Sequence, residues 1–407
     1  MEKMVDYSSS FWKSLTEFAK NCEHPFFIYR LDQLSERIQL LRTPGIKLWY
    51  ACKANPLSSI LKTIAGQDLG LDVASEGELI AGLKSGFPPE NILCTGPLKS
   101  RKYLETLVNS GVKTFVLEGP RQLDDLYQIC ADNGVSDIDI LLRFQLEWET
   151  TKFSVLGGNQ KTPFGMTPDE WENALAKKDY FKVLNFKGIH AFQWGNITDS
   201  GELESIWKHI ITLSKKFANK LSLPIRVVDL GGGLGLDYEQ SGDELDLASV
   251  KSILQKLKKE SGLEELWLEL GRILTGPIGS YLTKVGDMKK VRGENLIITE
   301  GGVNHILRPV LTDSYFPCTS LKDQSADKKI EYSLHGPLCT ALDRLGTFKL
   351  STNIQIDDWI AFTHCGAYGF TESMPFFLCH TLPGEAIFDE GEINFIRRPG
   401  PPSEWMK

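Results

Sequence analysis

A lysine at the end of an apolar stretch is the residue whose setting most suggests chemistry. Residues 46–54 form a short, apolar, β-rich run that delivers Lys53 and stops at Asn55-Pro56. Such a run is typical of a buried parallel strand. A lysine there is costly to bury unless it is paired or chemically used. Either its ammonium extends past the strand end to water, or its amine forms a Schiff base with a carbonyl compound, because burial lowers a lysine pKa towards reactivity.

Two further motifs could hold other parts of a ligand. Residues 229–235 read Asp-Leu-Gly-Gly-Gly-Leu-Gly after an apolar run, and such glycines let backbone N–H groups approach an anion such as a phosphate. A tight turn without a ligand is the alternative. Residues 269–272 read Glu-Leu-Gly-Arg, and Glu269 could pair with a ring nitrogen that must stay protonated, which makes a pyridine cofactor an electron sink. A salt bridge between Glu269 and Arg272 is the alternative there.

These motifs lie in a regular alternation of strands and helices. The candidate strands are residues 47–54, 69–74, 92–96, 114–117, 137–144, 186–192, 226–230 and 266–270. Amphipathic helices lie between them, and two of these begin with capping boxes at Ser75 and Thr167. The pattern predicts an α/β fold, a (β/α)8 barrel, with an open doubly wound sheet as the alternative. A barrel places functional groups at the carboxyl ends of its strands. The residues at or near such ends are Lys53, Asp72, Arg143, His190, Gly231 and Glu269.

After Arg272 the pattern changes to short strands separated by turns, which predicts a second, all-β domain. We therefore expect an N-terminal segment, residues 1–26, that packs with the β domain, a barrel over residues 27–272, and a β-sandwich or β-barrel domain over residues 273–407. Cys339 lies in a probable loop of this domain and is either an acid or a small buried hydrophobe. Tyr368 offers a phenol that could donate to a phosphate oxygen, or it fills a domain seam.

Composition narrows the class of protein. The 407 residues are 42% hydrophobic and 24% charged, with a net charge of −8, which is ordinary for a globular enzyme and argues against nucleic acid or an acidic membrane surface as partner. No signal peptide or membrane-length apolar run is evident. The 8 cysteines are scattered without a C-x-x-C pair, so we expect neither a metal site nor disulfides, but free thiols in the cytoplasm.

Taken in order, the motifs resemble a known family. The runs YACKANP, DVASEGE, VVDLGGG, ELGR, HGPLCTALD and GAYG are similar to those of the fold-type III pyridoxal-phosphate decarboxylases, which include the diaminopimelate, ornithine and arginine decarboxylases. The resemblance extends from about residue 25 to residue 399. It implies an alanine-racemase-like barrel, pyridoxal 5'-phosphate as cofactor, and a homodimer whose active sites are shared between subunits.

The resemblance also implies roles for individual residues. Lys53 would carry the Schiff base with the cofactor, Glu269 would pair with the pyridine nitrogen, and Cys339 of the partner subunit would donate a proton. The residues implied to contact the cofactor are Lys53, Asp72, Arg143, His190, Phe192, Gly232, Gly233, Glu269, Gly271, Arg272 and Tyr368. The residues implied to contact the substrate are Arg308, Thr340, Asp343 and Tyr368.

Departures from the family pattern bear on the substrate. Phe192 stands where the family has a histidine that stacks on the cofactor ring, no serine follows it to hold phosphate, and Thr340 replaces the acid that grips a distal charge. These features resemble the branch that decarboxylates conjugated amino acids, such as the butirosin-pathway and siderophore-pathway enzymes. We therefore expect α-decarboxylation of an L-amino acid or amino-acid conjugate. The alternatives are a diaminopimelate or ornithine decarboxylase, an amino-acid racemase, and a cofactor-binding protein without turnover.

Overall fold

The computed structural model describes residues 9–147, 160–177, 179–242, 244–312, 314–322, 328–401 and 403. The chain divides into two compact units. One comprises Ile38–Leu236 and Leu245–Gly271, and the other comprises Met1–Arg37, Asp237–Glu244 and Arg272–Lys407. We describe each unit by itself.

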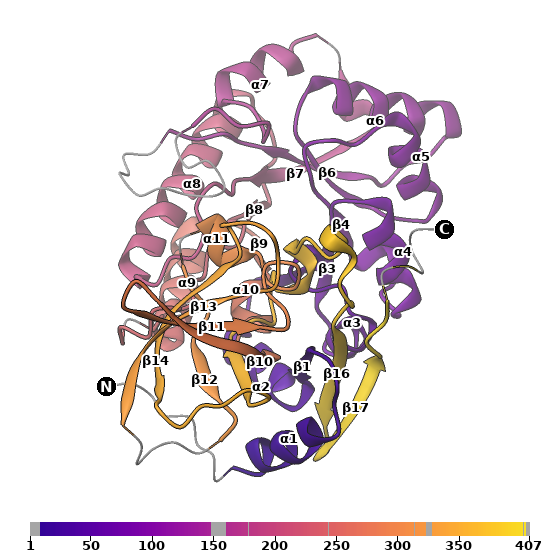
Figure 1. The fold of residues 1–407 in the computed structure, drawn as a ribbon. Coiled ribbons are helices and arrows are strands. Elements are labelled where there is room, and N and C mark those ends of the chain that lie inside the picture. Colours follow the sequence, from indigo (N-terminus) through magenta and orange to yellow (C-terminus); the bar gives the residue numbers. More distant parts are fainter. Residues whose placement is uncertain are drawn as a thin grey trace. The chain divides into compact units, whose positions relative to one another are not determined.

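The first unit is a closed barrel of eight parallel strands, β2 to β9 in chain order (Figure 1). The strands are β2 (Ile46–Ala51), β3 (Gly70–Val73), β4 (Ile92–Cys94), β5 (Thr114–Leu117), β6 (Asp139–Arg143), β7 (Asn185–His190), β8 (Val227–Asp229) and β9 (Glu265–Leu270). Pairing of β2 with β9 closes the ring. The predicted (β/α)8 barrel is confirmed, and the doubly wound alternative is wrong. Each observed strand overlaps its predicted range.

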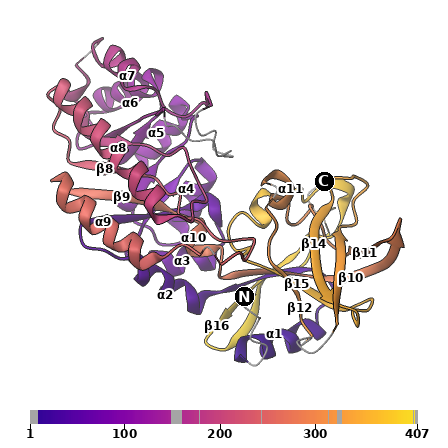
Figure 2. The ribbon, with the colours of Figure 1, turned by 90° about the vertical axis from the view of Figure 1, so that its left-hand side faces the viewer.

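Helices alternate with these strands. They are α3 (Ser58–Ala65), α4 (Glu76–Lys84), α5 (Arg101–Asn109), α6 (Pro120–Asn133), α7 (Pro168–Leu175), α8 (Ser200–Lys220) and α9 (Leu247–Ser261), and α8 packs beside α9 (Figure 2). Local sequence explains where several begin. Ser75 accepts a hydrogen bond from the Glu78 N–H at the start of α4, and a complete capping box at Thr167 starts α7 with proline in its first turn.

Large side chains fill the barrel interior. A buried cluster joins Trp49 and Trp267 to smaller apolar residues of the other strands, and the two indole rings lie 5.1 Å apart. The first residue of β3, Gly70, must be a glycine because a Cβ there would lie 2.1 Å from the Trp49 ring. The interior is therefore a packed core rather than a channel.

The second unit is built on a nine-stranded sheet. Its strands are β1 (Phe26–Arg30), β10 (Gly279–Val291), β11 (Glu294–Thr299), β12 (Cys318–Ser320), β13 (Lys329–His335), β14 (Arg344–Ser351), β15 (Trp359–Thr363), β16 (Gly384–Asp389) and β17 (Glu392–Arg397). Helix α1 (Ser10–Lys20) packs Phe11 and Leu15 into the same core as Phe26 and Leu282. Short helices α10 (Arg272–Thr275) and α11 (Arg308–Thr312) complete the unit.

Strand β1 belongs to the second unit, so the barrel begins later in the chain than the sequence predicted. It pairs antiparallel with β10 and parallel with β16, so residues 27–30 belong to the sheet of the second unit and not to the barrel. Helix α2 (Leu31–Leu41) then leads into the barrel, and residues 237–244 also belong to the second unit. The barrel range of 27–272 therefore differs from the structure at its start and within this insertion. Sequence periodicity indicated neither pairing of β1, because each joins strands that are distant in the sequence.

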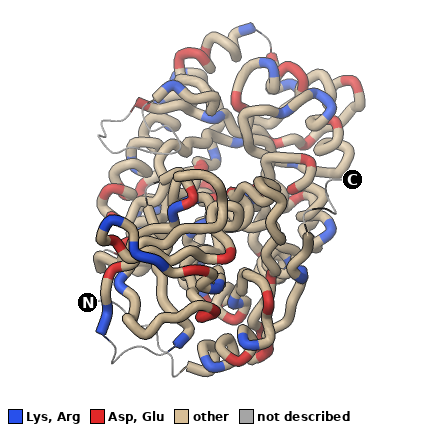
Figure 3. The backbone as a smooth tube through the Cα atoms, viewed as in Figure 1, with Lys and Arg blue, Asp and Glu red and all other residues tan. Residues whose placement is uncertain are grey.

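Charged residues of both signs are interspersed along the chain (Figure 3). Among the described residues, none of the helices combines the length and the apolar character needed to cross a bilayer.

Candidate active site

The carboxyl ends of the barrel strands bring together the polar residues expected from the sequence. Asp72 lies in β3, Arg143 and His190 end β6 and β7, and Glu269 lies one residue before the end of β9. One ligand atom each from His190, Asp229 and Glu269 lies within 4.8 Å of the others. Because parallel strands all point to one rim, residues distant in sequence converge there.

Local structure presents Lys53 at this rim. Strand β2 ends at Ala51 and turns into a single 3-10 turn, η1 (Cys52–Ala54). Cys52 and Ala54 are buried, whereas Lys53 between them is exposed. The Tyr50 hydroxyl donates to the Asn55 carbonyl at 2.9 Å, which closes the turn. The Lys53 Nζ lies 5.9 Å from the centre of the Phe192 ring. The turn therefore directs an amine out of a rigid, buried strand.

One carboxylate oxygen of the buried Glu269, Oε1, lacks a hydrogen-bond donor among the described residues. It lies 3.1 Å from His190 Nε2, but neither atom makes a hydrogen bond within the described structure. Burial opposes ionisation of Glu269, yet His190, Lys53 and Arg143 together hold its pKa below its usual value. Burial also lowers the pKa of His190, against the influence of Glu269. An ionised carboxylate with an unused oxygen is thus held for a donor from a ligand.

Two further carboxylates stand near Glu269. Burial, and then the charge of Glu269, raise the pKa of Asp72 to about 8, although its Oδ1 accepts a hydrogen bond from the Thr95 hydroxyl at 2.6 Å. The same two causes raise the pKa of Asp229. Its Oδ1 accepts from the Gly231 N–H at 2.9 Å. We did not assign Asp229 a role from the sequence, although it opens the glycine motif and ends β8.

The glycine loop presents backbone donors beside these carboxylates. Among the described residues, no partner is found for the N–H groups of Gly232, Gly233 and Leu234. Gly233 has a φ of +98°, and a Cβ on Gly232 would lie 2.4 Å from the Glu269 carbonyl oxygen. Only glycine permits this path. The loop therefore forms a set of N–H groups suited to an anion.

Arg143 and Phe192 are linked at the same rim. An Nη2–H of Arg143 donates to the Phe192 carbonyl at 3.2 Å, and Nη1–H donates to Glu118 Oε1 at 2.8 Å. The guanidinium also lies 4.6 Å from the centre of the Phe164 ring. The sequence motifs assigned no role to Glu118. It follows β5 directly, however, and therefore lies at the carboxyl end of a barrel strand like the predicted site residues.

In the second unit, Tyr368 lies between two arginines. The guanidinium carbons of Arg272 and Arg308 lie 4.9 Å and 4.6 Å from the centre of its ring. Arg272 donates to the Tyr238 hydroxyl at 2.8 Å, and Arg308 pairs with Glu372 at 2.6 Å. Three of the predicted residues are thus brought together, with Tyr238 and Glu372 as neighbours that the sequence did not suggest.

The loop between β13 and β14 carries the remaining predicted residues. Cys339 is exposed and Thr340 is half-buried. Asp343 is only 2% exposed, and its two carboxylate oxygens accept the N–H groups of Val303 and Leu338, each at 2.7 Å. Asp343 therefore fixes the shape of the loop that presents Cys339 and Thr340.

Comparison with known proteins identifies the family. Residues 31–276 match the pyridoxal-binding domain of the pyridoxal-dependent decarboxylases. The chain belongs to this family. It is a lyase of fold-type III, a decarboxylase that depends on pyridoxal phosphate.

Three curated relatives and one solved structure show how far the similarity extends. Diaminopimelate decarboxylase of Aquifex aeolicus is 28% identical, over 95% of this chain and 91% of the relative. L-glutamyl-[BtrI acyl-carrier protein] decarboxylase of Niallia circulans is 26% identical, over 95% and 94%. The 2-[(L-alanin-3-ylcarbamoyl)methyl]-2-hydroxybutanedioate decarboxylase of Staphylococcus aureus is 28% identical, over 90% and 95%. The crystal structure of diaminopimelate decarboxylase from Helicobacter pylori shares the fold, with a TM-score of 0.86 at 21% identity over 96% and 98% of the chains.

The barrel rim fits pyridoxal phosphate on its own geometry. The unused Glu269 Oε1 can accept a hydrogen bond from a pyridine N–H, and the glycine-loop N–H groups suit a phosphate. Arg143 Nε is a buried donor without a partner among the described residues, so an acceptor from the cofactor would satisfy it. Lys53 supplies the amine that a carbonyl group requires.

Proposed function

We propose that the protein decarboxylates the α-carboxylate of an L-amino acid whose far end is acylated, esterified or joined to a larger group. The observation that carries this proposal is Thr340, a neutral residue in the Cys339 loop. Two relatives whose names describe conjugated amino acids support it. Siderophore or secondary-metabolite synthesis would use such a substrate.

Each barrel residue has a role in this proposal. When bound, pyridoxal phosphate supplies an aldehyde for the amine and a protonated ring that takes up electrons as carbon dioxide leaves. Lys53 would supply the amine that holds the cofactor covalently. Glu269 would accept the proton of the ring nitrogen, and Phe192 would line the space beside the Lys53 amine. The Gly232–Gly233 backbone holds the phosphate, together with Gly271, Arg272 and Tyr368, while Asp72, Arg143 and His190 line the pocket.

We further propose that Cys339 of a second copy delivers a proton from its Sγ to the α-carbon. The exposure of Cys339 in the second unit supports this role. The active protein would then be a homodimer with shared sites. Its eight cysteines are free thiols, which supports a reducing compartment, the cytoplasm.

Charge at the Cys339 loop decides the substrate class. A free diamino acid brings a second ammonium group, and an unpaired ammonium in a dry interface is costly, typically several kcal/mol. Thr340 offers no charge, and Asp343 already accepts two backbone N–H groups. Arg308 is paired with Glu372 and stands beside Tyr368, where we propose that it meets the substrate.

Diaminopimelate decarboxylation is the second candidate, since a relative similar over nearly the whole chain carries that name. Steady-state kinetics on ornithine, lysine, meso-diaminopimelate and an N-acylated diamino acid separate the two. We expect the conjugate to be preferred, and Thr340→Glu to raise activity on the free diamino acids, with the exposed Thr352→Glu as the control. A kcat/KM above roughly 10⁴ M⁻¹s⁻¹ on meso-diaminopimelate, within the ordinary range for natural substrates, would overturn the conjugate proposal.

Subunit complementation tests the shared site. Lys53→Ala and Cys339→Ala proteins, each inactive, should recover part of the activity when their subunits are mixed. No recovery despite demonstrated subunit exchange would mean that each site is built within one chain.

A further inference from the structure

We propose that Glu118 is a positioning residue that fixes Phe192 opposite Lys53 by acting through Arg143. The inference rests on the proposed function, in which Lys53 and Phe192 meet the cofactor. It adds a residue to which the sequence motifs assigned no role.

Strand pairing leaves Phe192 in need of support. Strand β7 ends at His190, whose partner on β6 is Arg143. Beyond it the Ala191 N–H donates to the Asp229 carbonyl at 3.1 Å, and the regular ladder then stops. The Phe192 carbonyl instead accepts the Arg143 Nη2–H at 3.2 Å. A guanidinium thus takes the place of a neighbouring strand.

The Phe192 ring is confined on its other sides. A Cβ on Gly231 would lie 2.5 Å from the Phe192 Cβ, so the ring packs directly on the glycine loop. Its centre lies 5.9 Å from Lys53 Nζ. A small movement of the Phe192 backbone would therefore change the relation between the ring, the amine and the loop that faces the phosphate.

Glu118 determines where the Arg143 guanidinium lies. Glu118 is 6% exposed. Oε1 accepts the Arg143 Nη1–H, and Oε2 accepts the Gly165 N–H, both at 2.8 Å. Gly165 has a φ of +67°, and a Cβ there would lie 2.6 Å from the Arg143 carbonyl oxygen. Glu118 thus joins the arginine to the turn that carries Phe164, whose ring covers the guanidinium.

A buried network holds Glu118 itself. Its N–H donates to Gln122 Oε1 at 3.0 Å, and the Gln122 amide donates to the Pro97 carbonyl at 3.0 Å. Lys99 Nζ donates to the same Gln122 oxygen at 3.2 Å and to the Gly96 carbonyl at 2.7 Å. The backbone of Glu118 is therefore fixed by this network, and a fixed residue can position another.

Cofactor binding distinguishes a positioning role from a purely structural ion pair. The Glu118→Gln protein should bind pyridoxal phosphate about tenfold more weakly or worse, as expected for losing a buried charge-assisted hydrogen bond. The visible circular dichroism of the bound cofactor should also change, because the ring lies in an altered asymmetric environment. Glu118→Asp keeps the charge and should restore part of both. Melting temperatures of the cofactor-free proteins show that the variants are folded.

Asp139→Asn is the matched control. Asp139 begins β6 and pairs with Lys187 of β7 at 2.5 Å. The substitution therefore removes a carboxylate from the other end of the same two strands. It should lower stability while leaving cofactor affinity within about twofold, a change of about 0.4 kcal/mol.

A double variant tests the route through Phe192. In a Phe192→Leu background, Glu118→Gln should lose most of its effect on cofactor affinity, since coupled residues are non-additive. Additive effects, or a folded Glu118→Gln protein with unchanged affinity and dichroism, would overturn the inference. Failure of the unaltered protein to bind pyridoxal phosphate would instead overturn the proposed function.

Discussion

The two ends of strand β2 each carry a lysine, and the barrel uses the two differently. Lys47 lies near the amino end and Lys53 just beyond the carboxyl end. Both have carboxylates near them. The comparison shows what distinguishes a charged residue that supports a fold from one that is held for a ligand.

At the amino end Glu265 and Asp139 have partners within the fold, although the Arg42 Nε–H and the Trp49 indole N–H are buried without a hydrogen bond in the described part of the chain. Lys47 Nζ lies 4.1 Å from the centre of the Trp49 ring and 5.4 Å from that of Trp267. Burial lowers the pKa of Lys47, and Glu265 acts against that change. Glu265 in turn accepts the Trp267 indole N–H at 2.8 Å.

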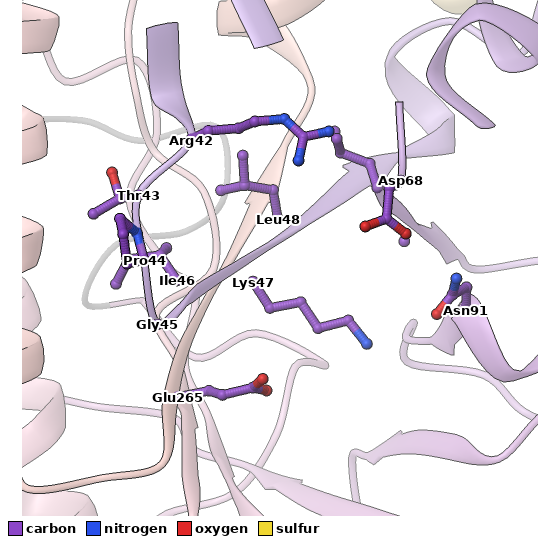
Figure 4. A pocket seen from close by; sticks show the side chains of 12 residues that line it. Arg42, Thr43, Pro44, Gly45, Ile46, Lys47, Leu48, Asp68, Asn91 and Glu265 are labelled. Atoms are coloured by element: carbon purple, nitrogen blue, oxygen red, sulfur yellow. The ribbon is translucent and has the colours of Figure 1, made fainter. Parts of the chain in front are cut away.

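The same end also contains a pocket of about 580 Å³ with lining residues of both charges (Figure 4). Figure 4 shows Arg42 and Lys47 extending from one side, with Asp68 and Asn91 on the other. Its lining includes Arg42, Lys47, Asp68 and Glu265, and the Arg42 Nη2–H donates to the Gln67 carbonyl.

At the carboxyl end the charges are left incompletely satisfied. Glu269 has an unused oxygen, and Asp72 and Asp229 have raised pKa values. Unsatisfied buried groups cost stability, and proteins retain them where they act on a ligand. The two ends thus differ in their buried carboxylates, because Glu265 has a partner in the fold whereas one oxygen each of Asp229 and Glu269 has none among the described residues.

The largest expected effect on kcat comes from substituting Lys53, with a substitution of Lys47 as the comparison. Lys53→Ala should lower kcat by at least about 10³-fold, because it removes the covalent amine. Lys47→Met should leave kcat within about twofold, since its partners are aromatic rings and carboxylates of the fold. Single-turnover carbon dioxide release measures both. Equal losses in two folded variants would remove the distinction between the ends.

A smaller but still large effect should follow from the carboxylates of β9. Glu269→Gln should lower kcat by about 10²-fold, the scale seen when one electrostatic partner of a reacting group is removed. Glu265→Gln, on the same strand at the other end, should change kcat little. If Glu269→Gln retains full activity, its unused oxygen does not serve the ring nitrogen.

The pH dependence of the cofactor-free protein sharpens the comparison. The folded-state pKa of Asp72 is raised from 3.8 to about 8. Its protonated form therefore stabilises the fold fully below 3.8, and this contribution is lost as the pH rises through about 8. Asp72→Asn should flatten the decline in melting temperature over that range, whereas Asp139→Asn should not. An unchanged slope in Asp72→Asn would mean that another group titrates.

The smallest effect should come from the ion pair at the amino end. Asp139→Asn should lower the free energy of unfolding by about 1 kcal/mol, because the Asp139–Lys187 pair is partly exposed. Urea denaturation monitored by tryptophan fluorescence measures it. A loss above about 3 kcal/mol would show that the pair behaves as a fully buried one.

Sequence alone determined the strands, the helices and the family motifs, because these depend on residues that are neighbours in the chain. Alternating apolar runs and helix caps at Ser75 and Thr167 predicted the barrel, because strand and helix formation depend on neighbouring residues. The strand-end rule placed Lys53, Arg143 and Glu269 on one rim, since every parallel strand ends on the same side. The motif order predicted the cofactor and the family.

Tertiary structure decided the strand pairings and hydrogen bonds between residues that are distant in the sequence. Strand β1 pairs with β16, so Phe26 lies opposite Gly384, and no local pattern reports a partner at the other end of the chain. Asp343 could have faced a substrate, yet its oxygens accept the N–H groups of Val303 and Leu338. Glu118 is linked to Phe192 through Arg143. Hydrogen-bond partners depend on which buried groups meet in space, and packing settles that after the chain has closed on itself.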